Sequence, residues 1–197
     1  MNVYLVTFRP VQDSFTSAVL DRVLATLHDG GHEVRVADLV ADGFRPELSA
    51  AEHAAHRTPL DLDEFPDLAG YVDALRWCET LVLVYPTWWS GQPAMLTGWL
   101  DRVLANGVAW AMPAGATRIT PLLRNLRRIV VVTTHGSSKL VNAAQGEGGK
   151  RVISRAVRLV CHPLTRTTWL ALYGVDRSSR ADRQRFLDRV ERRLAKL

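Results

Sequence analysis

Two adjacent tryptophans, Trp88 and Trp89, stand between an apolar run and a segment with the pattern of a helix. The run Leu81–Tyr85 predicts a buried strand that breaks at Pro86. Pro93 favours a helix start, because its missing N–H would have no partner in the first turn. The tryptophans are therefore expected on a loop at the carboxyl end of a strand. Flat ligands bind beyond the strand ends of open α/β sheets, so this loop predicts a site for a planar cofactor.

The loop Phe8–Thr16 follows the first apolar run and leads into a helix. A helix N-terminus binds anions through its free N–H groups and its dipole. Ser14 and Thr16 would add hydroxyl donors there, and Arg9 a positive charge. The plainer alternative is that Ser14 is only the N-cap of the helix. No GxGxxG or Walker sequence occurs in this loop, so neither a Rossmann dinucleotide site nor a P-loop is expected.

A third loop, Thr133–Ser138, follows another apolar run. Gly136 permits a close approach of the backbone to a ligand, and the hydroxyl and N–H groups around it would meet the polar edge of a ring. The alternative for this loop is an ordinary connection between a strand and a helix. For the two tryptophans the alternative is packing in the core.

The elements that must position these loops are five strands alternating with five main helices. Short apolar runs predict strands at Asn2–Thr7, Glu33–Ala37, Thr80–Tyr85, Arg128–Thr134 and Thr165–Tyr173. Helical spacing predicts helices from Asp13 or Ser14 to Gly30-Gly31, and at Asp67–Cys78, Ala94–Leu104, 149–161 and Ser179–Leu197. Residues 38–64 are expected to form a long loop with a short helix from Ser49, and residues 106–127 an irregular excursion. We therefore predict one domain over residues 1–197, a doubly wound parallel sheet of order 2-1-3-4-5 with helices on both faces.

The composition limits the classes of function. The 197 residues are 47% hydrophobic, which suffices for one core. The two cysteines form no CxxC pair, so neither a disulfide framework nor a zinc site is expected, and a reducing, cytoplasmic setting fits. We expect no signal peptide and no membrane helix. His53 and His56 are three residues apart but lack a third ligand, so no metal site is predicted.

The charge is unevenly distributed along the chain. Residues 118–197 hold 18 Lys and Arg against 5 Asp and Glu, whereas residues 1–117 hold 7 Arg against 15 acidic residues. The basic half would attract nucleic acid, an anionic membrane or a phosphorylated nucleotide. No nucleic-acid-binding motif accompanies the charge, so nucleic acid is not expected as a partner.

The chain resembles the NAD(P)H:quinone oxidoreductases of the flavodoxin-like fold, which include bacterial modulators of drug activity and accessory reductases of potassium efflux systems. The matching segments are Arg9–Thr16, the sequence YPTWWSGQPAMLTGWLDRV at Tyr85–Val103, Thr133–Ser137 and Leu48–Glu52. The resemblance implies a homodimer with a bound flavin, reduced by NADH or NADPH and reoxidised by a quinone. It implies ping-pong kinetics, because nicotinamide and quinone would use the same flavin face in turn.

The resemblance also implies roles for individual residues. Those expected to hold the flavin phosphate are Arg9, Ser14, Phe15 and Thr16. Those expected to line the isoalloxazine ring are Pro86, Thr87, Trp88 and Trp89, with Thr133, Thr134 and Gly136 at its far edge. FMN is expected rather than FAD, because the chain lacks the long C-terminal extension of the FAD-binding relatives. NADH and NADPH are not distinguished.

The chain departs from the family pattern after its second threonine. His135-Gly136 replaces a Gly-Gly pair, and residues 139–148 lack the Tyr and His that in vertebrate-type members take up charge on the reduced flavin. Our hypothesis is that His135 or Lys139 substitutes electrostatically. The departure leaves the acceptor open, so reduction of azo or nitro compounds and a biosynthetic reduction remain alternatives.

Two other classes of function remain open. A flavodoxin-type electron carrier would share the fold, but those proteins are strongly acidic, whereas this chain has a pI of about 9.7. A regulatory subunit of a membrane transporter would use the basic half as a docking face. Dimerisation is inferred from the family and from the apolar excursion Trp99–Met112.

Overall fold

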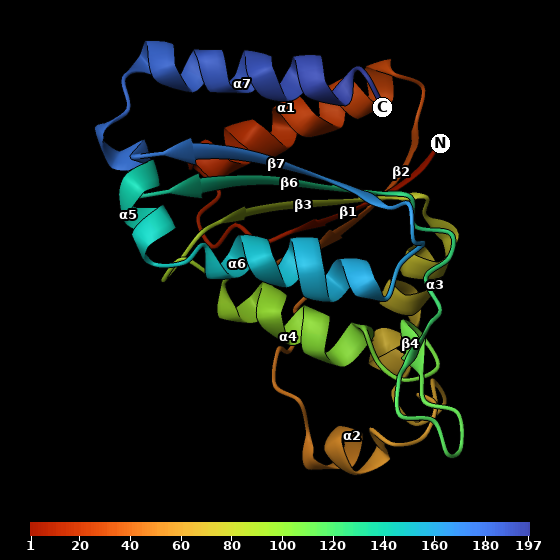
Figure 1. Cartoon of the computed structure of the whole chain (residues 1–197). Helices are drawn as coiled ribbons and strands as arrows, with labels where there is room; N and C mark the ends of the chain where they lie inside the picture. The colour runs from red at the N-terminus through yellow and green to blue at the C-terminus, as the bar shows by residue number, and fades with distance from the viewer.

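A parallel sheet of five strands forms the centre of the molecule, in the order β2-β1-β3-β6-β7 (Figure 1). The computed structural model describes all residues 1–197. The strands of the sheet are β1 (Asn2–Thr7), β2 (Glu33–Asp38), β3 (Thr80–Pro86), β6 (Arg128–His135) and β7 (Arg166–Tyr173). Each lies within one residue of its predicted bounds. The parallel sheet of five strands with helices on both faces is therefore confirmed.

The numbering of the sheet differs from the predicted 2-1-3-4-5 because of two short strands in the excursion 106–127. Strands β4 (Trp110–Ala111) and β5 (Thr120–Pro121) pair with each other in an antiparallel ladder outside the main sheet. The excursion was expected to be irregular. A pair of two-residue strands is too short to produce a readable alternation in the sequence.

Helices cover both faces of the sheet. In Figure 1, α1 (Phe15–Asp29) and α7 (Arg180–Leu194) lie above it, and α3 (Ala69–Trp77), α4 (Ala94–Val103) and α6 (Gly148–Arg151) lie below it. Alternate residues of each strand serve the two cores, because successive side chains of a strand point to opposite faces. Along β1, Val3 and Leu5 pack in the core of α1 and α7, whereas Tyr4 and Val6 pack in the core of α3 and α4.

Several helices begin where the sequence indicates. Ser14 caps α1, and Ser49 and Ser179 form capping boxes at α2 (Ala50–Ala55) and α7. The predicted helix Asp67–Cys78 starts instead as a 3₁₀ turn, η1 (Pro66–Leu68), and Pro93 precedes α4 as its N-cap. A second 3₁₀ turn, η3 (Val175–Arg177), leads into α7.

The predicted helix 149–161 differs most from the structure. It consists of α6 and a following π-helical segment, η2 (Val152–Val157), and a further helix, α5 (Lys139–Ala144), precedes it. Helix α5 was not predicted, because its six residues are too few to show a helical period. None of the helices is long and apolar enough to cross a membrane.

Candidate functional site

The three predicted loops meet at the carboxyl edge of the sheet. Strand β3 lies between β1 and β6, so the loops after these strands are neighbours. Backbone hydrogen bonds continue past the strand ends: Phe8 N–H donates to the Val84 carbonyl at 3.1 Å, and Thr87 N–H to the Thr134 carbonyl at 2.8 Å. The sheet therefore fixes the first residues of the loops after β1 and β3.

The tryptophan loop closes into a tight turn over Trp88–Gly91. Trp88 and Gly91 exchange two backbone hydrogen bonds, of 3.3 and 2.9 Å. The two central residues, Trp89 and Ser90, have φ of 50° and 57°, which is the geometry of a type I′ turn. Each non-glycine residue in this left-handed region costs about 1–2 kcal/mol. Backbone strain of this kind concentrates at functional sites.

The turn displays both tryptophan rings. Trp88 packs edge-on against Phe8 of the neighbouring loop, with ring centroids 5.8 Å apart, and still exposes 51% of its surface. Trp89 is fully exposed, at 101%. The alternative that these tryptophans are core residues is therefore wrong. The ring of Trp88, which packs on Phe8, and the fully exposed ring of Trp89 form an apolar surface that a planar ligand would cover.

The start of α6 holds the turn from below. Gly149 N–H donates to the Ser90 carbonyl at 2.8 Å, and the Gln92 side-chain amide donates to the Gly149 carbonyl at 2.7 Å. A Cβ on Gly149 would lie 3.1 Å from Gly91 Cα, so a larger residue would push the turn outward by a few tenths of an ångström. The position of the tryptophans thus depends on the helix that follows the third loop.

A pocket of about 310 Å³ lies between the tryptophan turn and the third loop. Its walls are polar apart from the two indoles, and are formed by Thr87, Trp88, Trp89, Ser90, His135, Gly136, Ser137, Asn142 and Gln145. A groove of about 620 Å³ lies on the other side of the same two tryptophans, between Pro46-Glu47 and α4. Trp88 and Trp89 therefore separate two hollows, either of which would receive part of a ligand.

His135 is the most constrained polar residue of the pocket. It ends β6, is buried at 6% exposure, and its ring stacks on Tyr173 with centroids 4.6 Å apart. Its Nδ1 lies 2.8 Å from Asn142 Oδ1 and its Nε2 lies 3.4 Å from Thr87 Oγ1. The hydroxyl of Thr87 is also 2.8 Å from that of Thr133. A polar chain therefore runs from the sheet to α5 along the pocket wall.

Asn142 determines which imidazole nitrogen carries the proton. Its Nδ2 donates to Ser137 Oγ at 2.7 Å and to the Ser138 carbonyl at 2.9 Å, so Oδ1 must face His135. An amide oxygen only accepts, so His135 Nδ1 carries the hydrogen and Nε2 is left as an acceptor. Burial lowers the pKa of His135 below its ordinary value of 6.5, and the hydrogen bond with Asn142 and the charge of Glu147 offset only part of this. His135 is thus a neutral acceptor at neutral pH.

Asn142→Asp is expected to raise the pKa of His135 by about 1–3 units, because a carboxylate would replace the amide oxygen beside Nδ1. The imidazolium would then persist through neutral pH. An NMR titration of the histidine Cε1–H resonances measures the shift, with His135→Gln assigning the signal. The isosteric change keeps the side-chain volume, so an unmoved His135 titration in a folded variant would contradict the assigned hydrogen bond.

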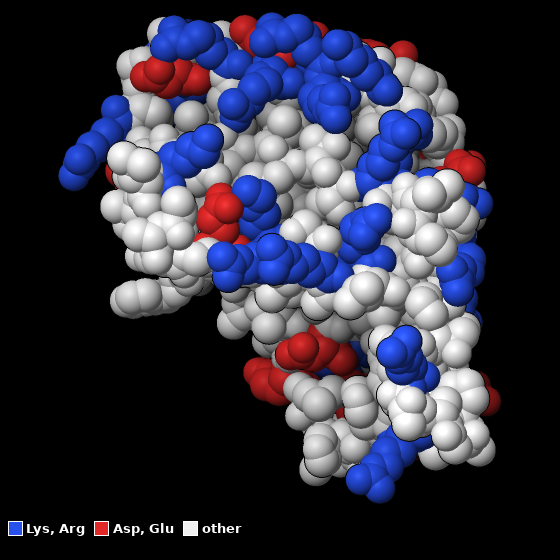
Figure 2. Space-filling model, in the orientation of Figure 1, with Lys and Arg blue, Asp and Glu red and all other residues white.

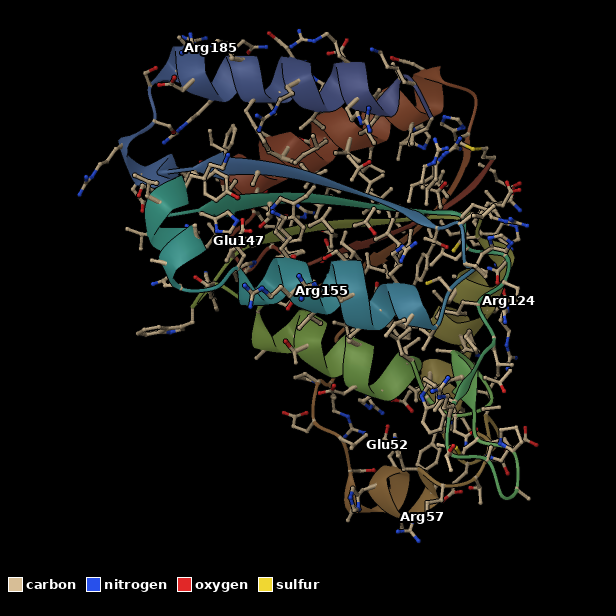
Figure 3. All side chains as sticks on the ribbon, viewed as in Figure 1. Glu52, Arg57, Arg124, Glu147, Arg155 and Arg185 are labelled. Atoms are coloured by element: carbon tan, nitrogen blue, oxygen red, sulfur yellow. The ribbon has the colours of Figure 1, made fainter.

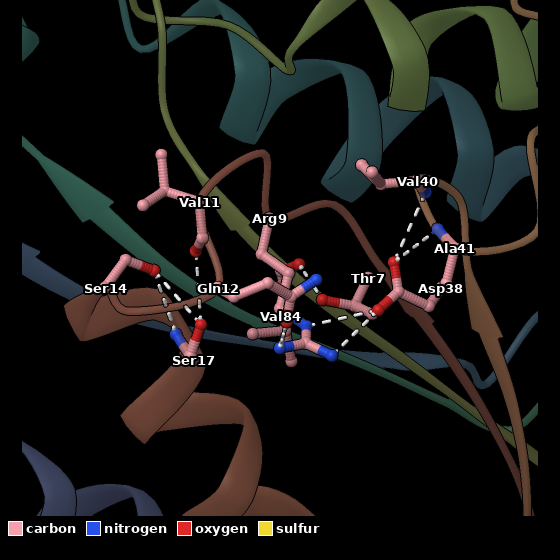
Figure 4. Close-up of polar contacts among 10 residues, drawn as sticks. All are labelled: Thr7, Arg9, Val11, Gln12, Ser14, Ser17, Asp38, Val40, Ala41 and Val84. Carbon is pink, nitrogen blue, oxygen red and sulfur yellow. Dashed lines mark hydrogen bonds and ion pairs between the residues drawn. The ribbon is translucent and has the colours of Figure 1, made fainter.

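The β1–α1 loop has a different arrangement from the one predicted for a phosphate site. Figure 4 shows Arg9 reaching back to Asp38, with Nη2 3.0 Å from the carboxylate, and also contacting Gln12. Ser14 Oγ accepts from Ser17 N–H at 3.3 Å, as its N-cap role requires. The loop therefore offers a helix N-terminus, but the charge of Arg9 is already balanced by Asp38.

Of the other predicted site residues, four are packed into the protein and one, Lys139, is exposed. Phe15 packs against Phe186 of α7, and Thr16 is buried in the first turn of α1. Thr133 and Thr134 are buried in β6, beside the pocket wall. Lys139, by contrast, is exposed at the start of α5 and does not line the pocket.

Sequence reasoning missed three residues of the site: Asn142, Gln145 and Tyr173. Asn142 and Gln145 lie on or directly after α5, the helix that was not predicted. The signal that would have found them is Ser138, which caps α5 and accepts from Val141 N–H. Tyr173 comes from β7 and is brought to His135 by the pairing of the two strands.

Known proteins resemble this chain in sequence and in fold, and the structural matches cover the whole chain, including the candidate site. The uncharacterized NAD(P)H oxidoreductase YcaK of Escherichia coli is 32% identical over 108 residues, which is 55% of each chain. The NAD(P)H:quinone oxidoreductase of Methanothermobacter marburgensis superposes with a TM-score of 0.82 at 28% identity, over 100% of this chain and 96% of that one. An FMN-dependent NADH-azoreductase of Bacillus anthracis, solved with FMN, has a TM-score of 0.78 at 15% identity over 100% and 99% of the two chains, which shows the fold alone.

The matches to curated proteins are partial, whereas the match to the family model is nearly complete. The aligned region spans about half the length of the first curated relatives. The model of the flavodoxin-like fold, in contrast, matches residues 1–196. Together with the strand order β2-β1-β3-β6-β7, this match shows that the chain belongs to the flavodoxin-like fold family.

Proposed function

We propose that this chain is a flavin-dependent NAD(P)H oxidoreductase that passes a hydride from NADH or NADPH to a quinone or a similar two-electron acceptor, by a ping-pong mechanism. The observation that carries the proposal is the tryptophan turn. Trp88 and Trp89 are displayed on a strained backbone beside a polar pocket, at the sheet edge where this fold binds ligands. The named relatives, an NAD(P)H oxidoreductase and an NAD(P)H:quinone oxidoreductase, support the same reaction class.

The residues present fit a flavin. The first turn of α1 contains no acidic residue and leaves N–H groups without intrahelical partners, as a phosphate requires. Gly136 forms part of the pocket wall without a side chain, which leaves its backbone free to approach a ring. We infer that the phosphate lies at Ser14, Phe15 and Thr16, and that the ring lies between the tryptophan turn and the third loop.

FMN is the form we propose. A protein of the same fold, the azoreductase of Bacillus anthracis, was crystallised with FMN, so the fold accommodates this cofactor. The 310 Å³ pocket and the adjoining groove would serve the ring and the reacting substrate.

A bound flavin would supply the hydride chemistry, accepting the hydride from the nicotinamide and donating it to the acceptor. The residues of the chain position the reactants and control water. Trp88 and Trp89 would cover a stacked ring and exclude water from it. Neutral His135 accepts a hydrogen bond at Nε2 and so holds an N–H or O–H of a ligand. This role replaces the electrostatic one expected for His135, and exposed Lys139 is left as a weaker candidate.

The homodimer implied by the family is part of the proposal, but its surface differs from the one inferred from the sequence. Trp99 is fully buried in the core, so it is not available at an interface. Met112 at the end of the segment Trp99–Met112 is exposed, as are Ile119 and Trp89 outside it. Sedimentation of the purified chain, with and without FMN, would measure the oligomeric state.

The first test is an absorbance spectrum of the purified protein after incubation with FMN and gel filtration. Flavin absorbance should elute with the protein, bleach on anaerobic addition of NADPH or NADH, and return on addition of a quinone. A protein that retains neither FMN nor FAD would overturn the proposal. A flavoprotein that NAD(P)H does not bleach would indicate an electron carrier instead.

Trp89→Ala is expected to weaken FMN binding by about tenfold and to leave the free energy of unfolding within about 0.5 kcal/mol of the original. The reason is that Trp89 is fully exposed, so its ring would contact a bound ligand and contributes nothing to the protein core. Fluorescence titration with FMN and urea denaturation measure the two quantities. The matched control is Leu140→Ala, which removes another exposed apolar side chain, 83% accessible, outside the pocket. Equal losses in both variants would count against a ligand-binding role for the turn.

A further inference from the structure

The outer face of α6 and η2 is basic and apolar, with no acidic residue. From Arg102 to Val175 the chain contains eleven Lys and Arg but a single acidic residue, Glu147. Figure 2 shows blue side chains across the middle of the molecule, where α6 lies in Figure 1. Figure 3 labels Arg155 on η2 and Glu147 just before α6.

The arginines of this face have no structural role that accounts for them. Arg151 and Arg155 lie one helical turn apart and are exposed, and neither side chain makes a hydrogen bond or an ion pair. The arginines of α7 differ, because Asp182, Asp188 and Glu191 share that helix and Asp182 pairs with Arg185.

Large apolar side chains accompany these charges. Leu159, which follows η2, exposes 67% of its surface, and Leu164 in the next turn exposes 76%. Val152 lies between Arg151 and Arg155 and is also exposed. The inward side of the same segment, Ile153, Val157 and Val160, is buried in the core. The helix therefore cannot turn its leucine toward the protein, and the apolar atoms remain in water.

We propose that this face, formed by Arg151, Val152, Arg155, Leu159 and Leu164, docks on the surface of an anionic membrane. Basic residues beside exposed aliphatic side chains are the composition of helices that lie in a membrane interface. Each basic residue near an anionic bilayer contributes about fivefold in affinity, and the leucines insert among the acyl chains.

Nucleic acid suits this face less well. Phosphates would meet the arginines, but Leu159 and Leu164 would then be held against a polar backbone with no gain from burial. Protein interfaces with nucleic acid bases use aromatic rings for stacking, and the exposed large side chains of this face are aliphatic. The apolar part of the face thus distinguishes a bilayer from a nucleic acid.

The docking face is joined directly to the candidate site. Gly149 at the start of α6 holds the tryptophan turn through Ser90 and Gln92. A membrane bound along α6 would therefore lie beside the entrance of the pocket. The docking proposal itself does not depend on the proposed function, because membrane binding is measured without any redox reaction.

The test is co-sedimentation of the full chain, loaded with FMN where it binds, with two kinds of vesicle. One kind is phosphatidylcholine alone and the other has half of its lipid replaced by phosphatidylglycerol. We expect binding to the anionic vesicles only, and weaker binding at high salt because the ions screen the charges. Absence of binding to the anionic vesicles would overturn the proposal.

Three double variants separate this face from the general charge. Arg151→Glu with Arg155→Glu should weaken vesicle binding by more than about 100-fold, because four units of charge change at the surface. Arg192→Glu with Arg193→Glu makes the same charge change on α7 and should weaken binding by less than about fivefold. Leu159→Ser with Leu164→Ser should weaken vesicle binding by about tenfold and leave any binding to duplex DNA unchanged. Equal effects of the two charge variants, no effect of the leucine variant, or tighter binding to duplex DNA than to vesicles would each contradict membrane docking.

Discussion

Replacing Arg102 by methionine is expected to lower the free energy of unfolding by about 3–5 kcal/mol, which is a large part of the stability of a domain of this size. Arg102 lies on α4 and its side chain is only 4% exposed. It donates to Glu52 Oε1 at 2.6 Å, to Asp67 Oδ2 at 2.8 Å and to the Arg45 carbonyl at 2.7 Å. These three partners come from the beginning, middle and end of the excursion between β2 and α3.

The cost arises from what the substitution leaves behind. The Glu52 side chain is 5% exposed, so methionine would leave a buried carboxylate without its cation. Removing one partner of a buried pair is much more costly than removing both. Urea denaturation of Arg102→Met, Glu52→Gln and the double variant tests this: the double variant should be more stable than Arg102→Met. If the double variant loses as much free energy of unfolding as the two single variants lose together, the two residues do not interact.

The pair of Glu52 and Arg102 also makes the free energy of unfolding depend on pH in the acidic range. Burial alone would raise the pKa of Glu52, but hydrogen bonds from Ser49 and Arg102 hold it below its ordinary value of 4.5. Since the pKa is lower in the folded state, the pair contributes its stability above pH 4.5 and loses it as the pH falls toward the folded-state pKa. In Glu52→Gln this part of the acid dependence should be absent.

The sequence predicted the fold well because each strand carries its own signal. The run Arg128–Thr134 is apolar and β-branched almost throughout, and the structure buries this strand on both faces. The short helix predicted from Ser49 and the helix end predicted at Gly30-Gly31 depend on local features that need no tertiary information. Where the local signal was weak, as in the six residues of α5 and the short strands β4 and β5, the elements were missed.

The site was predicted less completely because part of it is created by tertiary contacts. The two tryptophans and His135 stand out by residue type and position. The partners of His135 do not: Asn142 comes from α5, and Tyr173 from the edge strand. Arg9 shows the opposite case. Its place in the loop predicted a phosphate ligand, but Asp38, 29 residues later and at the end of the neighbouring strand, holds its guanidinium.

Gly98→Ala is the second substitution with a large expected effect, a loss of about 3 kcal/mol in the free energy of unfolding. In an exposed helix the change would gain up to about 1 kcal/mol, because alanine favours the helix more than glycine does. At Gly98, however, the added Cβ would lie 2.2 Å from the Pro46 carbonyl oxygen and 2.5 Å from Pro46 Cα. The backbone of residue 46 would have to move away from α4, and overpacking of this kind costs more than the helix gains.

The matched control is Gly70→Ala in α3. No atom lies within 4 Å of a Cβ built there, so this variant should gain stability by up to about 1 kcal/mol where Gly98→Ala loses it. Opposite signs in urea denaturation would show that the contact with Pro46, and not glycine replacement as such, decides the outcome; a stabilised Gly98→Ala would contradict the packing. Pro46 and Gly98 also line the groove beside Trp88, so displacing this segment should weaken ligand binding in the folded fraction of Gly98→Ala. Arg102 holds the segment between β2 and α3 against α4 through the Arg45 carbonyl. The next residue of that segment, Pro46, packs on Gly98 and forms one wall of the groove. This segment therefore contributes both to the stability of the fold and to the shape of the site.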